Sequence, residues 1–115
     1  MCGIYGIIGR DAKKFEKGFN EMGQKLFHRG PDFSGKYISN NLLLGHQRLS
    51  ILDLSKSANQ PLKSSNGKSI ISFNGEIYNH QLLRQMLETC QKAPTWRGHS
   101  DTETLLAGFD EWGIE

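Results

Sequence analysis

The sequence lacks several features that mark common classes of protein. It has only two cysteines, Cys2 and Cys90, which are too few for a disulfide framework, so we expect reduced thiols and a cytoplasmic location. No apolar run approaches the ~18 residues that a membrane span needs. The 14 lysines and arginines are spread along the chain, whereas nucleic-acid-binding proteins gather basic residues on one face. We therefore expect neither a membrane nor a nucleic acid as partner.

Two further patterns are missing. The chain does not open with a basic segment followed by an apolar core, so we expect no secretory signal. No histidine stands at metal-ligand spacing from a cysteine or another histidine. We therefore expect no metal ion bound by this chain.

What is present amounts to about one domain, with 115 residues. The apolar run at residues 4–8 predicts a buried strand. Residues 11–27 follow with helical periodicity, and Asp11 is the expected N-cap. The apolar side chains that share one face of this helix are Phe15, Phe19, Met22, Leu26 and Phe27.

The middle of the chain has the period and the turn residues of β-structure. Residues 36–39 and 42–50 predict a hairpin, whose turn, Asn40-Asn41, tolerates the positive φ values of a two-residue connection. A polar loop is expected at residues 55–67, and a further strand at 69–73.

Two more helices are predicted after this strand. The first covers residues 80–90, and the second begins at Ser100, which has Glu103 at capping-box spacing, and ends before Gly113. The order of strand, helix, strands, helix and helix predicts an α+β fold. The side chains expected on the inner face of the first of these helices are Leu82, Leu83, Met86, Leu87 and Cys90.

Cys2 is the first candidate for chemistry. If Met1 is removed, Cys2 carries both a thiol and a free α-amine, and such an amine loses its proton close enough to neutral pH to act as the base for the thiol. N-terminal threonine enzymes use the same pairing of nucleophile and base. The alternative, which Cys2 alone does not exclude, is a small buried side chain without a chemical role.

Other residues could complete a site for acyl transfer. Asn74 and Gly75 offer a side-chain N–H and an unobstructed backbone N–H, which suit an oxyanion hole, although Asn-Gly is also a common hairpin turn. Arg48 can hold a carboxylate with two parallel hydrogen bonds, and Glu76 and Asp101 can hold an ammonium group. Taken singly, each of these three charged residues also fits an ordinary surface position.

The segment His28-Arg29-Gly30-Pro31-Asp32 ends the first predicted helix. Gly30 and Pro31 are helix breakers in the expected order. The segment can be a simple connection, or it can shape a site, because it gathers three ionisable side chains within five residues. We expect residues 28–32 to be a structural connection.

Five segments together resemble a known family. The sequence is similar to the glutaminase domain of asparagine synthetases, which are class II glutamine amidotransferases of the N-terminal-nucleophile hydrolase group. The resemblance covers nearly the whole chain, in the family's order. The segments that carry it are Met1-Cys2-Gly3-Ile4-Tyr5-Gly6, His28-Arg29-Gly30-Pro31-Asp32, Arg48-Leu49-Ser50-Ile51, Phe73-Asn74-Gly75-Glu76-Ile77-Tyr78-Asn79 and Ser100-Asp101-Thr102-Glu103.

The resemblance implies a role for each candidate. Met1 is removed and Cys2 attacks the side-chain amide of glutamine, which releases ammonia and then, through a thioester, glutamate. Asn74 and Gly75 match the oxyanion-hole positions. The residues that match substrate-binding positions are Arg48 for the α-carboxylate, Glu76 and Asp101 for the amino end, and the backbone of Ile51 and Leu52 for the pocket wall.

The resemblance also implies the fold and the setting. The family fold is an α/β/β/α sandwich of antiparallel sheets, of which residues 1–115 would be the N-terminal part, with further strands and an ATP-binding synthetase domain beyond. The expected ammonia acceptor is aspartate or a sugar-linked carboxylate. No cofactor is expected in this stretch, and ATP and Mg²⁺ are expected for the synthetase domain.

Two alternatives stay open. The chain could be a non-catalytic fragment that binds glutamine or glutamate without turnover. An incomplete sandwich would also leave an apolar sheet face and strand edges uncovered, which favours self-association into a homo-oligomer.

Overall fold

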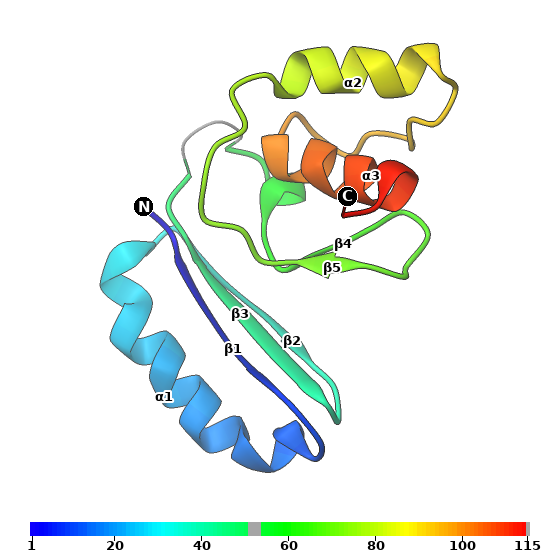
Figure 1. The fold of residues 1–115 in the computed structure, drawn as a ribbon. Helices are drawn as coiled ribbons and strands as arrows, with labels where there is room; N and C mark the ends of the chain where they lie inside the picture. Colours follow the sequence, from blue (N-terminus) through cyan, green and yellow to red (C-terminus); the bar gives the residue numbers. More distant parts are fainter. Residues whose placement is uncertain (51–53, 115) are drawn as a thin grey trace. The chain divides into compact units, whose positions relative to one another are not determined.

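The computed structural model describes residues 1–50 and 54–114 of the chain, which form two compact units. The first unit contains residues 1–50, 59–61 and 72–74, and the second contains the described residues of 54–58, 62–71 and 75–114. Figure 1 shows the order of the elements along the chain. Because the chain passes between the units more than once, each unit is built from segments far apart in the sequence.

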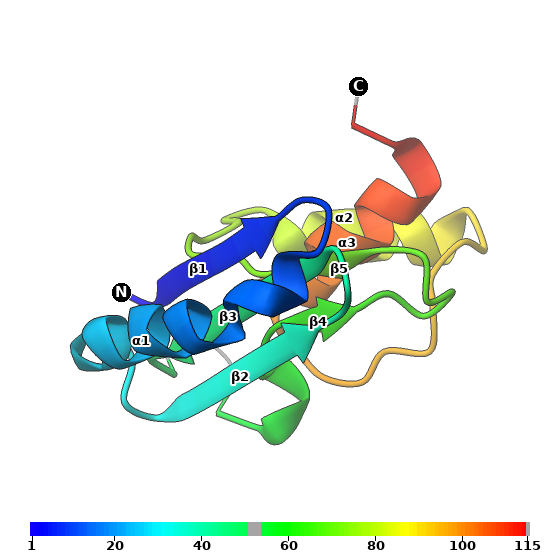
Figure 2. The same cartoon turned by 90° about the horizontal axis from the view of Figure 1, so that it is seen from below.

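The first unit is a sheet of three antiparallel strands with one helix on it. The strands are β1 (Gly3–Ile8), β2 (Phe33–Ile38) and β3 (Leu42–Arg48), in the order β1-β3-β2. Helix α1 (Glu16–Leu26) lies along one face of this sheet, as Figures 1 and 2 show. Short 3₁₀ helices precede and follow α1, at Ala12–Phe15 and Phe27–Arg29.

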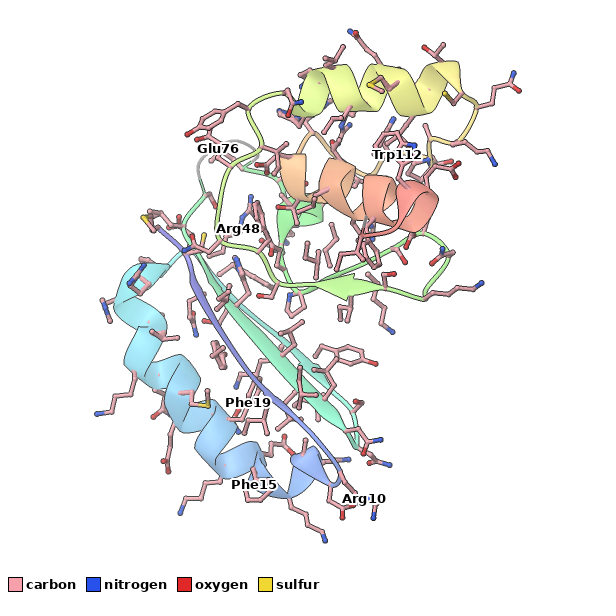
Figure 3. All side chains as sticks on the ribbon, in the orientation of Figure 1. Arg10, Phe15, Phe19, Arg48, Glu76 and Trp112 are labelled. Atoms are coloured by element: carbon pink, nitrogen blue, oxygen red, sulfur yellow. The ribbon has the colours of Figure 1, made fainter. Side chains whose placement is uncertain are left out.

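The core of the first unit lies between α1 and the sheet. Phe19 and Leu43 are fully buried, and Tyr5 is 6% exposed. The rings of Tyr5 and Phe19 lie 4.9 Å apart between their centroids, in a tilted arrangement. Figure 3 shows Phe19 between the helix and the sheet, where the helical period predicted an apolar face.

The opposite face of this sheet is crossed by short segments of the same unit. Ser72 Oγ donates to the carbonyl of Gly45 at 3.1 Å, and the Phe73 N–H donates to Gln60 Oε1 at 2.6 Å. These bonds hold residues 72–74 and 59–61 against β3, so His46 on that strand is fully buried. The face that α1 does not cover therefore carries buried polar side chains.

The second unit combines a short hairpin with two helices. Its elements are β4 (Leu62–Lys63), β5 (Ile70–Ile71), the 3₁₀ helix Lys56–Ala58, α2 (His80–Thr89) and α3 (Asp101–Trp112). Strands β4 and β5 pair antiparallel. Leu87 and Leu106 are buried beside a polar cluster in which the guanidinium of Arg84 bonds Thr104 and pairs with Glu103 at 3.5 Å.

The predicted α+β class with antiparallel sheets is confirmed, and several local predictions are corrected. Asp11 does not cap the first helix with its side chain; it has a φ of 59° and forms an ion pair with Lys14 instead. The hairpin at residues 33–48 forms, but neither Asn40 nor Asn41 has a positive φ, and the Ser39 hydroxyl and Leu42 bond each other across the turn.

The loop expected at residues 55–67 contains the 3₁₀ helix and β4, and β5 is shorter than the strand predicted at 69–73. Helical periodicity also overestimated how many side chains are buried. Phe15 is 60% exposed, Leu82 is 56% exposed, and Cys90 is exposed rather than part of the core. The period tells which residues share a face, but not how much of that face a neighbour covers.

Candidate active site

Cys2 and Arg48 lie at the same end of the three-stranded sheet. Gly3 pairs with Gln47, and Phe33 pairs with Arg48. Residues that oppose one another in an antiparallel pair project to the same face. Cys2 directly precedes Gly3 and Arg48 directly follows Gln47, so both residues lie at this end of the sheet.

The Cys2 thiol is half-buried and held by backbone groups. The N–H of Leu49 donates to Cys2 Sγ at 3.2 Å, and the thiol lies 3.4 Å from the carbonyl oxygen of the same residue. The side chain of the preceding Met1 is 71% exposed.

Arg48 is a buried cation with a fixed orientation. The residue is only 6% exposed, and its Nη1 donates to Asn59 Oδ1 at 2.5 Å. A guanidinium has five donors in one plane, so a neighbour that anchors one of its nitrogens orients the others. Figure 3 labels Arg48 where β3 ends.

The loop at residues 28–32 clamps the chain around Arg48. The N–H of Asp32 donates to the Arg48 carbonyl at 3.0 Å, and Asp32 Oδ2 accepts from the Ser50 N–H at 2.8 Å. A Cβ on Gly30 would lie 2.2 Å from the Gln47 carbonyl oxygen, so this loop can pass β3 only with glycine at that position. The segment has the structural role expected of it, and that role is to hold the site strand.

Asn74 lies in the first unit, at the end of the segment that crosses β3. Ser72 bonds Gly45, and the carbonyl of Phe73 lies 3.2 Å from Nε2 of His46. As the segment advances by one residue, its partner on β3 also advances by one, toward Arg48. No strand occurs at residues 75–79, all of which are described, so Asn74-Gly75 is not a hairpin turn.

His46, on the same strand as Arg48, is fully buried. Burial lowers the pKa of His46 below its ordinary value, and the positive charge of Arg48 acts in the same direction, while the bond to the Phe73 carbonyl opposes them. The neutral imidazole is therefore the form that the fold favours.

The candidates for the amino end of the substrate lie in the second unit. Asp101 occupies the first turn of α3 and is 5% exposed. Its Oδ2 accepts from the N–H of Ile77 at 2.8 Å, which ties the loop after Gly75 to the start of α3. Glu76, in that loop, is exposed and is labelled in Figure 3. The structure thus brings Asp101 to the residue next to Glu76.

The predicted site residues fall into two groups. Cys2, Arg48 and Asn74 belong to the first unit, and Gly75, Glu76 and Asp101 to the second. Residues Ile51 and Leu52 lie outside the described residues.

Sequence reasoning missed three side chains that organise the first group. Asn59 anchors Arg48, Gln60 accepts from the Phe73 N–H, and His46 bonds the Phe73 carbonyl. The available signal was the run His46-Gln47-Arg48 within a predicted strand, since consecutive polar residues on both faces of a buried strand need partners. The run does not indicate which residues bond His46 and Arg48, because these partners lie 11 to 27 positions further along the chain.

Comparison with known proteins yields a consistent set of relatives. A family described as "Glutamine amidotransferase domain" matches residues 1–115. Asparagine synthetase B [glutamine-hydrolyzing] of Escherichia coli K12 is 42% identical over 117 aligned residues, which cover 100% of this chain and 20% of that protein. A probable asparagine synthetase [glutamine-hydrolyzing] of Schizosaccharomyces pombe is 41% identical, covering 98% of this chain and 20% of that protein.

A plant relative has the same extent of match. Asparagine synthetase [glutamine-hydrolyzing] 1 of Arabidopsis thaliana is 37% identical over 117 residues, covering 100% of this chain and 19% of that protein. The chain thus spans about a fifth of the length of the curated relatives it matches. Among the described residues, no helix is long and apolar enough to cross a membrane.

Proposed function

We propose that this chain, which belongs to the glutamine amidotransferase domain family, hydrolyses the side-chain amide of glutamine with Cys2 as nucleophile. The observation that carries the proposal is the Leu49 N–H that points at the Cys2 sulfur, at the end of the sheet where the buried Arg48 ends β3. A nucleophile and a carboxylate clamp are what a glutamine amidase needs first.

The chemical step begins once Met1 has been removed. The free α-amine of Cys2 takes the thiol proton, and Sγ attacks the amide carbon of glutamine. The tetrahedral intermediate expels ammonia, which leaves with the proton from the amine. Water then cleaves the resulting thioester, giving glutamate and the free thiol. Met1 is 71% exposed, so its removal would cost little packing.

Two donors would stabilise the oxyanion of the intermediate. The side-chain N–H of Asn74 and the backbone N–H of Gly75 are proposed for this role. The bonds that hold Ser72 and Phe73 against β3, the strand that ends at Arg48, support it. Each such donor is typically worth about 10²–10³ in rate.

The substrate would be held at both polar ends. Arg48, oriented by its bond to Asn59, is proposed to bind the α-carboxylate with its guanidinium group. Asp101 and Glu76 are proposed for the ammonium group. Asp101 accepts a hydrogen bond from the N–H of Ile77, the residue that follows Glu76, and this proximity supports a joint role. The backbone of Ile51 and Leu52 is proposed as part of the pocket wall.

The ammonia would serve amide formation, such as the synthesis of asparagine. The relatives are named as glutamine-hydrolysing asparagine synthetases, which supports this use. In the whole protein we propose an ATP- and Mg²⁺-dependent synthetase part and an α/β/β/α sandwich. Among residues 1–50 and 54–114, no group of three or more His, Cys, Asp or Glu side chains could hold a metal ion.

The test compares two cysteine variants of the complete natural protein. Cys2→Ser should reduce ammonia release from glutamine by about three orders of magnitude or more, while glutamate binding measured by calorimetry is kept. Cys90→Ser is the matched control, because Cys90 is exposed in the second unit and should leave the rate unchanged. Undiminished ammonia release by Cys2→Ser would refute the proposal, and glutamate binding without any ammonia release by the wild type would identify a binding module instead.

A further inference from the structure

The peptide group before Asn74 is fixed by an imidazole that no step of the proposed reaction uses. His46 Nε2 lies 3.2 Å from the carbonyl oxygen of Phe73. That carbonyl belongs to the same planar unit as the Asn74 nitrogen. The orientation of this plane fixes the position from which Asn74, and then Gly75, continue the chain.

The N–H side of Phe73 is held by a side chain as well. The N–H of Phe73 donates to Gln60 Oε1 at 2.6 Å, and Ser72 Oγ bonds the Gly45 carbonyl at 3.1 Å. The backbone on both sides of the Phe73 Cα therefore has a side-chain partner, from Gln60 on one side and His46 on the other. This is how a segment without a strand ladder of its own keeps a defined orientation.

The chemistry of the imidazole agrees with this use. A carbonyl oxygen can only accept, so Nε2 carries the proton and donates it to Phe73. In the neutral ring Nδ1 then carries a lone pair, and among the described residues it has no hydrogen-bond partner. His46 is fully buried, and burial disfavours the second proton. The ring is thus a fixed neutral donor to a single acceptor.

We propose that His46 is a positioning residue for the oxyanion hole: its Nε2–H holds the Phe73 carbonyl and so aims the Asn74 side chain and the Gly75 N–H at the reacting amide. The proposal rests on the proposed function, since it assigns His46 to that same site. His46 itself does not contact the substrate.

A positioning role of this kind predicts an effect on turnover rather than on binding. The oxyanion forms only in the transition state, so misplaced donors lower kcat and leave the ground-state contacts of glutamine unchanged. Arg48, which binds the substrate, is anchored separately by Asn59. Loss of the His46 bond should therefore separate kcat from KM.

The experiment uses His46→Leu and His46→Gln in the complete natural protein. Leucine fills the buried space without a donor, whereas glutamine keeps an N–H that can reach a carbonyl. We expect kcat for ammonia release to fall about tenfold or more in His46→Leu, with KM for glutamine within about threefold of wild type, and to recover in part in His46→Gln. His28→Leu is the matched control, because His28 is exposed.

A second readout does not depend on activity. Hydrogen exchange in the peptide that covers residues 72–76 should be about fivefold faster in His46→Leu, which corresponds to one lost hydrogen bond. An unchanged kcat and exchange rate in folded His46→Leu, or a rise in KM that accounts for the whole loss, would overturn the positioning role. If wild-type protein releases no ammonia, the proposed function fails, and the exchange rates still decide whether His46 holds this segment.

Discussion

At the residue scale, the feature that most constrains the site is the burial of Arg48. A buried charge is costly unless its donors are satisfied, and a residue 6% exposed can exchange few of them with water. Asn59 satisfies one nitrogen. A bound α-carboxylate would add an opposite charge beside this buried cation, in the bidentate geometry that arginine favours.

The first prediction concerns this clamp. Arg48→Gln removes the cation, and the loss of charge-assisted hydrogen bonds worth about 1.5–3 kcal/mol should raise KM for glutamine about tenfold to a hundredfold. Steady-state kinetics of the complete protein would measure it. Arg10→Gln, at an exposed position beyond the other end of β1, should leave KM unchanged. Equal values of KM for wild type and Arg48→Gln would exclude a carboxylate clamp at this position.

At the element scale, the packing of α1 on the sheet depends on a small residue at one point. A Cβ added to Gly23 would lie 2.5 Å from Tyr5 Oη, whereas one added to Gly18 in the same helix would meet nothing within 4 Å. Both glycines carry the same intrinsic penalty in a helix. Replacing each of them with alanine should therefore have different effects on stability only because of the contact between Gly23 and Tyr5.

The second prediction uses this matched pair. Gly23→Ala should destabilise the α1–sheet contact by about 1–3 kcal/mol, because the helix must move away from the buried Tyr5 ring. Gly18→Ala should stabilise it, by up to about 1 kcal/mol. Hydrogen exchange of the amides of α1 in the complete protein would measure both. The packing account fails if the two variants change protection in the same direction by similar amounts.

The second unit shows how an expected cap can be realised differently. Ser100 Oγ accepts from the Glu103 N–H at 3.2 Å, as the capping-box spacing predicts. The Glu103 carboxylate does not return to Ser100, however; it accepts from the N–H groups of Arg97 and Gly98 and pairs with Arg84. A local pattern predicted the helix start correctly, while competing buried donors from the preceding segment decided where the carboxylate points.

At the scale of the whole molecule, buried His46 makes stability depend on pH. Burial lowers the pKa of His46 in the folded state, and the unfolded chain keeps the ordinary value of about 6.5. Below pH ~6.5 the unfolded state therefore binds more protons, and the free energy of unfolding falls as the pH falls. Above that pH the contribution of the neutral imidazole is fully present.

The third prediction follows from this sign. The melting temperature of the wild type should decrease as the pH is lowered from about 7 to 5, and His46→Leu should show a smaller decrease over the same range. The exposed-site variant Arg10→Gln should keep the wild-type slope. Differential scanning calorimetry would measure the three slopes. Identical slopes for wild type and His46→Leu would show that His46 does not titrate on unfolding.

Much of the molecule could be predicted from local pattern. The apolar run of β1, the 3.6-residue period of α1 and the cap at Ser100 each depend on neighbours within a few positions, and each element forms where expected. Side-chain exposure could not be predicted in the same way. Cys90 and Leu82 have the period of an inner face, but a neighbouring element has to cover that face, and both are exposed.

The candidate site also contains residues that could be predicted from the sequence and residues that could not. Residue chemistry and family resemblance point to Cys2 and Arg48, and the register of β1 and β3 then brings them together. His46 and its bond to Phe73 join positions 27 apart in the chain, and no local rule predicts such a pairing. Residues that react can thus be recognised by type, whereas residues that hold them in place become visible only with the fold.

The central claim is that Cys2 is the N-terminal nucleophile that forms a thioester with glutamine. The most direct test is mass spectrometry of the complete natural protein, mixed with glutamine and quenched in acid within one turnover, followed by peptide mapping. The account predicts an N-terminal peptide that begins at Cys2, without Met1, and carries one glutamyl group on that cysteine. A protein that releases ammonia while retaining Met1, or that carries the glutamyl group on another residue, would contradict it.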